Sequence, residues 1–167
     1  MEQPSSPAAE LPQNFELAVI LDKRRTHTTP WRTHTWGAAG VVAAAGGDRS
    51  HGPQCIRAEE ALEQYLWPGF ELRLYRDEAE SYYHNLTSDN PGLFIVCRFD
   101  EDERPEPFLV TAAYDEASAY MEADDTVYRV PMPPEVYRWV EAYVLANYQP
   151  QERKKRKRTD WSEGDRQ

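Results

Sequence analysis

One apolar run constrains the fold of this chain more strongly than any other segment. β-Branched and aromatic residues favour strands, whereas Asn, Asp, Pro and Gly favour turns. The segment 89–92, Asp-Asn-Pro-Gly, is a clear turn sequence, and the apolar run follows it directly. A strand is therefore predicted for the residues Leu93, Phe94, Ile95, Val96, Cys97, Arg98 and Phe99.

Two further strands are expected near the start of the chain. Residues 15–21 are rich in strand-forming side chains, and the polar connection 23–26 separates them from a second extended stretch, 31–43. Strands joined by a short polar connection commonly pair, so we expect a hairpin. Glycine and proline then predict a loop over 46–56, and residues 57–66 are compatible with a short helical turn.

The middle of the chain contains one clear strand pattern and one ambiguous segment. Apolar and polar residues alternate over 70–75, which indicates a strand with one buried face. Residues 78–86 have apolar side chains at helical spacing, but their tyrosines also suit a strand, which is the preferred interpretation. An acidic, proline-containing loop, 100–107, leads to another predicted strand, 108–112.

Two helices are expected late in the chain. Residues 115–123 predict a short helix, and its inner side would carry Ala117, Tyr120 and Met121. A longer helix is expected from Pro133 onward, because proline is tolerated in the first helical turn, where its missing N–H costs nothing. Its apolar stripe, which we expect to pack across the sheet, comprises Val136, Trp139, Val140, Tyr143, Val144 and Asn147.

Together these elements predict an α+β fold. We expect a curved antiparallel sheet or small β-barrel with a short helix and a C-terminal amphipathic helix. A chain of 167 residues has room for one domain of ordinary size, and residues 14–149 are expected to form it. Residues 1–13 are rich in Pro, Ser, Ala and Glu and predict a flexible arm, and 150–167 predict a basic, disordered tail.

Charge is distributed very unevenly along the chain. Residues 1–152 contain 12 Lys and Arg against 26 Asp and Glu, a net charge of −14, and six consecutive basic residues follow. Such runs are usually solvated tails, but opposite charges of this size should attract each other unless a partner binds one of them. An acidic body would also repel a polyanion, which argues against nucleic acid as a partner. The basic run is Arg153, Lys154, Lys155, Arg156, Lys157 and Arg158.

Several patterns that would indicate a compartment or cofactor are missing from the sequence. The first residues lack the charged and apolar regions of a secretory signal, and no apolar run has the length of a membrane span. Cys55 and Cys97 are far apart without metal-binding spacing, and reduced thiols are typical of the cytosol. No glycine-rich phosphate loop is present. We therefore expect a cytoplasmic protein with no cofactor and no membrane insertion.

Two segments with aromatic and histidine residues are candidates for binding a partner. They contain Trp31, His34 and Trp36 in one case and Tyr82, Tyr83 and His84 in the other. If the first segment is extended, His34 and Trp36 share a face, where they would either hold a ligand or shield the end of a barrel. In the second segment, neutral imidazole can act as a base or a ligand near pH 7, but no second ligand stands at a suitable spacing.

An ordered series of sequence blocks resembles a bacterial family of unknown function, the domain of unknown function 3305. The blocks are residues 74–88, 107–111 and 129–136 and the basic run, and the Trp31 segment also fits. The resemblance extends over residues 15–158. It implies proteins encoded beside molybdenum-dependent formate dehydrogenases and their maturation factors. Some members are labelled as guanylyl-transfer proteins of molybdenum-cofactor synthesis, but residues 1–60 lack the glycine-rich nucleotide loop of such transferases.

The expected function is therefore that of a non-catalytic accessory subunit or assembly factor. Its partner would be the large catalytic subunit of a formate dehydrogenase or one of its maturation factors, bound through an aromatic surface and the basic tail. Tyr, Trp and Arg are enriched at protein interfaces, which agrees with the aromatic content of this chain. The alternative is a carrier module for a small cofactor, with its site at the mouth of the barrel.

Overall fold

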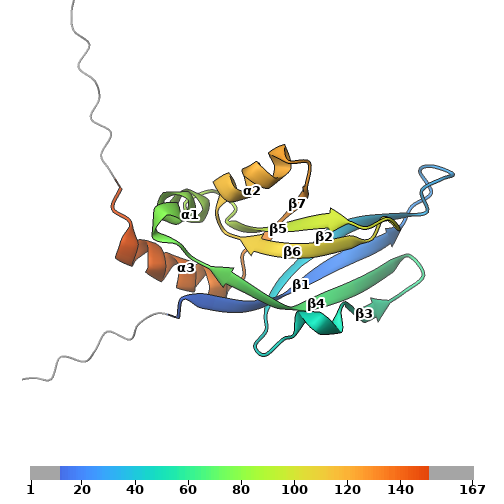
Figure 1. Ribbon diagram of the computed structural model, residues 1–167, viewed down its shortest axis with the longest axis horizontal. Coiled ribbons are helices and arrows are strands. Elements are labelled where there is room, and N and C mark those ends of the chain that lie inside the picture. Colours follow the sequence, from blue (N-terminus) through green and yellow to red (C-terminus); the bar gives the residue numbers. More distant parts are fainter. Residues whose placement is uncertain (1–11, 151–167) are drawn as a thin grey trace, which may run out of the picture.

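A computed structural model describes residues 12–150, in which seven strands form two antiparallel sheets accompanied by helices (Figure 1). The strands are β1 (Asn14–Arg25), β2 (His34–Ala43), β3 (Gln54–Ala58), β4 (Leu62–Arg73), β5 (Gly92–Phe99), β6 (Pro105–Thr111) and β7 (Thr126–Pro131). The helices are α1 (Ala79–Leu86), α2 (Tyr114–Glu122) and α3 (Pro134–Asn147), with short 3₁₀ helices η1 (Arg49–His51) and η2 (Arg76–Glu78). The predicted arm 1–13 and tail 150–167 lie almost wholly outside the described residues.

The larger sheet has the strand order β2-β1-β4-β3. The predicted hairpin of the first two strands is confirmed, since β1 pairs antiparallel with β2 along its length. The other edge of β1 pairs with β4, and bulges interrupt both ladders. In β4, Gly69 has a φ of 83° and packs so closely on the η1 loop that a Cβ would lie 2.7 Å from the Arg49 nitrogen. This contact requires glycine and fixes the loop against the sheet.

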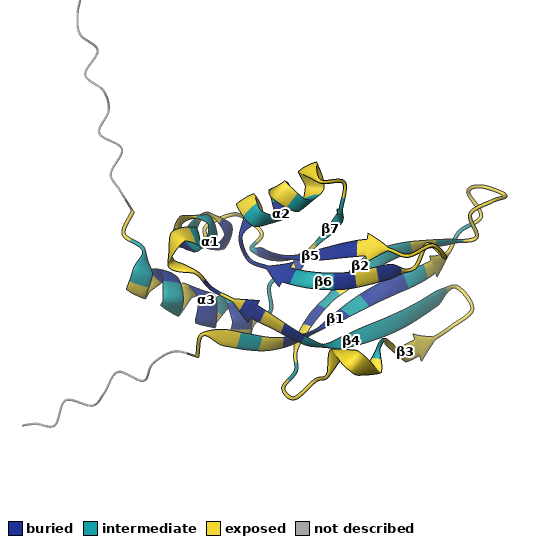
Figure 2. Cartoon of the chain, in the orientation of Figure 1, coloured by how far each residue is buried: buried dark blue, intermediate teal, exposed yellow. Residues whose placement is uncertain are grey.

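The smaller sheet, β6-β5-β7, lies over the larger one and explains the apolar run at residues 93–99. Leu93, Ile95 and Cys97 point into the core shared with the larger sheet. The alternate residues face α2, and the Phe94 ring lies 5.8 Å from the Tyr114 ring. Because β5 is covered on both faces, it is buried from Gly92 to Cys97 (Figure 2).

One end of this two-sheet core is closed by α1 and α3, which pack against each other (Figure 1). The Tyr82 ring of α1 lies 6.2 Å from the Tyr143 ring of α3. The Trp139 indole packs beside Phe15, and its Nε1–H donates a hydrogen bond to the Pro12 carbonyl at 2.8 Å. The buried residues of α3 are Val136, Trp139, Val140 and Val144.

The structure corrects four expectations. The prediction of a barrel is wrong, because the strand pairings in residues 12–150 form two separate sheets. Strand β2 lies against β7, and β4 lies against β6, without a hydrogen-bonded ladder between them.

The other three corrections concern local elements. The prediction of a strand over 78–86 is wrong, since this segment forms η2 and α1. The helical turn over 57–66 is wrong, because these residues belong to the β3–β4 hairpin. Met121 is exposed, whereas Ala117 is the buried residue of α2.

Candidate functional site

The end of the two-sheet core opposite α1 and α3 opens into a cleft, which we call the aromatic cleft. It has a volume of about 670 Å³. It lies between β2 and β7, and the loop before β2 and the turn between β5 and β6 form its rim. Its lining includes the charged residues Lys23, Asp102 and Glu103. It also includes Trp31, His34, Trp36, Phe99, Arg104 and Tyr128. Aromatic rings thus line a concave site at the point where the core is not capped by a helix.

A row of aromatic rings leads from the core to this cleft. Trp36 of β2 lies 5.8 Å from Tyr65 of β4, and Tyr65 lies 6.3 Å from Trp67. Burial raises the pKa of Tyr65, and the neighbouring Glu63 charge raises it further. The Lys23 ammonium lies 5.9 Å from the Trp36 ring centre and 3.6 Å from the Glu63 carboxylate. Tyr65 and Lys23 therefore flank the Trp36 side chain, which also lines the cleft.

The loop preceding β2 contributes the most exposed large hydrophobic side chain of the cleft. Trp31 is 88% exposed. An indole left in water does not contribute the free energy that its burial would provide. His34, the first residue of β2, forms a hydrogen bond of 2.8 Å between its Nδ1 and the Thr33 hydroxyl. This bond orients the imidazole and leaves Nε2 as its second polar atom.

The opposite wall of the cleft comes from the smaller sheet. Phe99 is the last residue of β5 and is exposed, and Tyr128 of β7 is half-buried. Burial raises the pKa of Tyr128, and the adjacent Cys97 adds to the effect. Burial also raises the pKa of the Cys97 thiol to about 12, so this cysteine is a neutral core residue at physiological pH.

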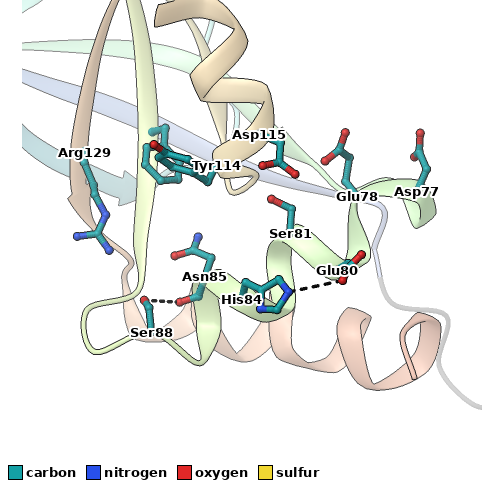
Figure 3. Close-up of a pocket in the computed structure, with 11 residues that line it drawn as sticks. Asp77, Glu78, Glu80, Ser81, His84, Asn85, Ser88, Tyr114, Asp115 and Arg129 are labelled. Atoms are coloured by element: carbon teal, nitrogen blue, oxygen red, sulfur yellow. Dashed lines mark hydrogen bonds and ion pairs between the residues drawn. The ribbon is translucent and has the colours of Figure 1, made fainter. Parts of the chain in front are cut away.

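A second hollow lies between α1 and α2, and we call it the acidic groove. Its volume is about 510 Å³. Figure 3 shows Asp115 of α2 opposite Glu78 and Ser81 of the η2–α1 segment, with Asp77 close by. Burial raises the pKa of Glu78, and the charges of Asp77, Glu116 and Asp115 raise it further. The like charges therefore repel each other across the groove.

Other residues that line the acidic groove interact with groups of the protein itself. Asn85 is buried and bonds to the backbone of Gly92 and Ala112. The Arg129 guanidinium donates a hydrogen bond to the Asn90 carbonyl. His84 is exposed, and its Nε2 lies 3.6 Å from a Glu80 carboxylate oxygen one helical turn away (Figure 3).

The candidate binding residues predicted from the sequence lie in different parts of the structure. Trp31, His34 and Trp36 lie together in the aromatic cleft. Tyr82 lies in the core, where its hydroxyl accepts a hydrogen bond from the Tyr75 N–H, and Tyr83 packs on Tyr148. His84 lines the acidic groove, and the basic run 153–158 lies outside the described residues.

Sequence reasoning missed the second wall of the cleft and the whole acidic groove. Phe99 and Tyr128 had no local motif to mark them, because only the folded sheets bring them opposite Trp36. The groove had a partial signal: Asp77-Glu78 and Asp115-Glu116 are acidic pairs at the start of two helices. Acidic residues are common there because they complement the helix dipole, so the pairs did not stand out.

Residues 12–150 contain neither a cluster suited to a metal ion nor a membrane-spanning helix. No group of three or more His, Cys, Asp or Glu side chains is arranged to hold a metal ion in this part of the chain. No helix among the same residues is long and apolar enough to cross a membrane.

The fold and the cleft define a class: a two-sheet α+β protein with a cleft lined by aromatic side chains at its uncapped end. The chain belongs to the family described as protein of unknown function DUF3305, whose model matches residues 16–157. No curated protein and no solved structure matches the chain.

Proposed function

We propose that this chain is a non-catalytic accessory protein that binds a partner protein through the aromatic cleft. The observation that carries the proposal is Trp31, an indole that is 88% exposed at the rim of a cleft already lined by Trp36, Phe99 and Tyr128. Aromatic residues and arginine dominate the binding energy of protein interfaces, and they act best where a cleft excludes water. Arg104 at the same rim adds a residue of this type.

The partner that we propose is a molybdenum-dependent formate dehydrogenase or one of its maturation factors. The support for this partner is the family resemblance of the sequence blocks, together with the family match over residues 16–157. The basic run 153–158 would supply a second contact, to an acidic surface of the partner. We place this interaction in the cytoplasm of a bacterial cell, where Cys55 and Cys97 remain free thiols.

The test is a Trp31→Ala variant. Because the side chain is almost fully exposed, the fold should keep its melting temperature. Loss of an interface hot spot costs about 2 kcal/mol, so the dissociation constant for the recombinant dehydrogenase should rise about 30-fold. Leu145→Ala, which removes a 77%-exposed hydrophobic residue that lines neither the aromatic cleft nor the acidic groove, is the control. Equal affinities of the two variants would exclude the cleft as the interface.

A second candidate function is favoured by the size of the cleft. A volume of about 670 Å³ lies within the range of small-molecule sites, which supports a carrier module for a small cofactor. Such a cofactor would stack on Trp36 beside the Lys23 ammonium. Protein purified from its native source should then carry an absorbing ligand, and Trp36→Leu should release it. A colourless preparation that copurifies with a large partner would support the accessory role instead.

A further inference from the structure

The acidic groove has a strong imbalance of charge. Asp77, Glu78, Glu80 and Asp115 line it, whereas its arginine, Arg129, is already bonded to the Asn90 carbonyl. Glu116 adds a fifth carboxylate, since it lines the adjoining hollow together with Tyr75 and Ala119. Aromatic rings of Phe94 and Tyr114 form part of the groove surface. A concave surface of this kind suits a cationic, extended segment that can lay its aliphatic stems on the rings.

The groove is also under electrostatic strain without a cation. Burial and the neighbouring carboxylates raise the pKa of Glu78, so the ionised form is disfavoured there. A cationic group placed between Glu78 and Asp115 would reverse that effect. The geometry of two helices with facing carboxylates thus agrees with the charge distribution (Figure 3).

The end of the described chain lies close to this groove. Tyr148, directly after α3, packs on Tyr83 of α1 with ring centres 5.0 Å apart. Glu80, which lines the groove, stands three residues before Tyr83 on α1, so the contact of Tyr148 with Tyr83 brings the chain end close to the groove. Pro150 is the last described residue, and the basic run starts three residues later. Three extended residues span about 10 Å and eight span about 27 Å, so the whole run can reach the groove.

We propose that the basic run 153–158 docks in the acidic groove of its own chain, with its Lys and Arg side chains paired to the carboxylates of η2, α1 and α2. This inference does not depend on the aromatic cleft. It gives the run two alternative positions, because an acidic partner surface would compete with the groove for the same six cations. Docking in the free protein would then regulate when the run is available to a partner.

The distribution of lysine makes a direct test possible. The chain has four lysines, Lys23, Lys154, Lys155 and Lys157. A water-soluble carbodiimide joins an ammonium to a carboxylate in contact with it, as an amide. Applied to the full chain at low salt, it should link the run to Asp77, Glu78, Glu80, Asp115 and Glu116 within one molecule. At about 1 M salt, where the Debye length is about 3 Å, these links should be lost.

Two variants separate docking in the groove from general attraction to an acidic body. Glu78→Gln, Glu80→Gln and Asp115→Asn together should reduce links to the untouched neighbours Asp77 and Glu116 at least about threefold, because three screened charge pairs are removed. The control neutralises three acids at or beside the β5–β6 turn, Glu101, Glu103 and Glu106, as Gln. It should leave the links unchanged.

Several results would overturn the proposal. These are links spread evenly over all carboxylates, links that favour the β5–β6 turn, links formed only between two molecules in a dilution series, or an equal loss in both variants. The unaltered chain at low and high salt supplies a readout that does not require any variant to fold. Affinity for a formate dehydrogenase is measured separately, so the failure of either proposal is recognised by itself.

Discussion

Asn85 connects three elements of the fold through its side-chain hydrogen bonds. Its amide nitrogen donates to the Gly92 carbonyl at 2.7 Å and to the Ala112 carbonyl at 2.9 Å, and its amide oxygen accepts from the Gly92 N–H at 3.0 Å. One buried side chain therefore fixes α1 against the start of β5 and the end of β6.

Asn85→Ala is predicted to destabilise the protein by about 2 to 4 kcal/mol, because buried backbone groups lose their hydrogen-bond partners. Asn85→Asp should be at least as damaging, since a carboxylate cannot donate to the two carbonyls. Denaturant unfolding checks both values, with the exposed Asn90→Ala as control. A loss no larger than that of the control would show that the three bonds contribute little.

Glu78 provides a prediction about pH. Its folded pKa is raised, chiefly by burial and then by three neighbouring acids, so the ionised form opposes folding. The penalty is absent below the unfolded pKa, appears as the pH rises from the unfolded towards the folded pKa, and persists at neutral pH. In a chain that lacks residues 153–158, so that the groove holds no cation from the run, Glu78→Gln should therefore raise stability at pH 7 by about 0.2 to 1 kcal/mol, the range of screened surface charges.

The gain from Glu78→Gln should disappear near pH 4 and shrink in high salt, because both conditions weaken the repulsion. Thermal melts at several pH values measure it. Glu101→Gln, in the exposed β5–β6 turn, is the control. A gain that is independent of pH would mean that the effect is not electrostatic.

At the scale of elements, α3 and α1 close one end of the core, and each depends on the other. Tyr82 and Trp139 are both almost fully buried, and α1 has the helical form because Ala79, Tyr82 and Leu86 then share one buried face. The local strand preference of tyrosine contributes less free energy than the burial of this helical face. The same packing positions η2 and α1 opposite α2 and so creates the acidic groove.

Trp139→Ala is predicted to cost about 3 to 5 kcal/mol, the usual range for emptying a large aromatic site. Trp139 is 7% exposed, packs on Phe15 and bonds to the Pro12 carbonyl, so its loss also frees the first described residues. Leu145→Ala, on the same helix but 77% exposed, should be nearly neutral. Urea melts that coincide for the two variants would contradict the assignment of Trp139 to the core.

At the scale of the whole molecule, two oppositely charged parts and two separate hollows define the surface. The aromatic cleft and the acidic groove lie at different ends of the two-sheet core, so a partner in the cleft does not itself fill the groove. The acidic body has a net charge of −14 over residues 1–152, which favours a cationic partner.

Deletion of residues 153–158 is predicted to weaken binding to the formate dehydrogenase partner about tenfold at low salt, with little difference at high salt, because charge contacts outside an interface core are screened. At high salt, where charge contacts of the run are screened, the melting temperature should stay the same, since α3 ends at Asn147, before the run. Titrations at two salt concentrations measure the effect. Identical affinities at low salt would leave the run without a role in binding.

The sequence alone predicted much of the local structure. The strand at residues 93–99, the hairpin of β1 with β2, and the two late helices follow from composition and spacing near each element. Trp31, His34 and Trp36 were also recognised as one group, because they are neighbours in the chain.

Only the tertiary structure decided the features that depend on distant residues. Leu62 to Trp67 became a strand because β1 offers a long pairing edge, and the segment 78–86 became a helix because α3 covers its apolar face. The sheets remained two rather than one barrel, since β2 and β7 meet without hydrogen-bonded pairing, and this separation opens the cleft where Phe99 and Tyr128 face Trp36. Sequence periodicity reports which face of an element is apolar, but not which distant element covers it.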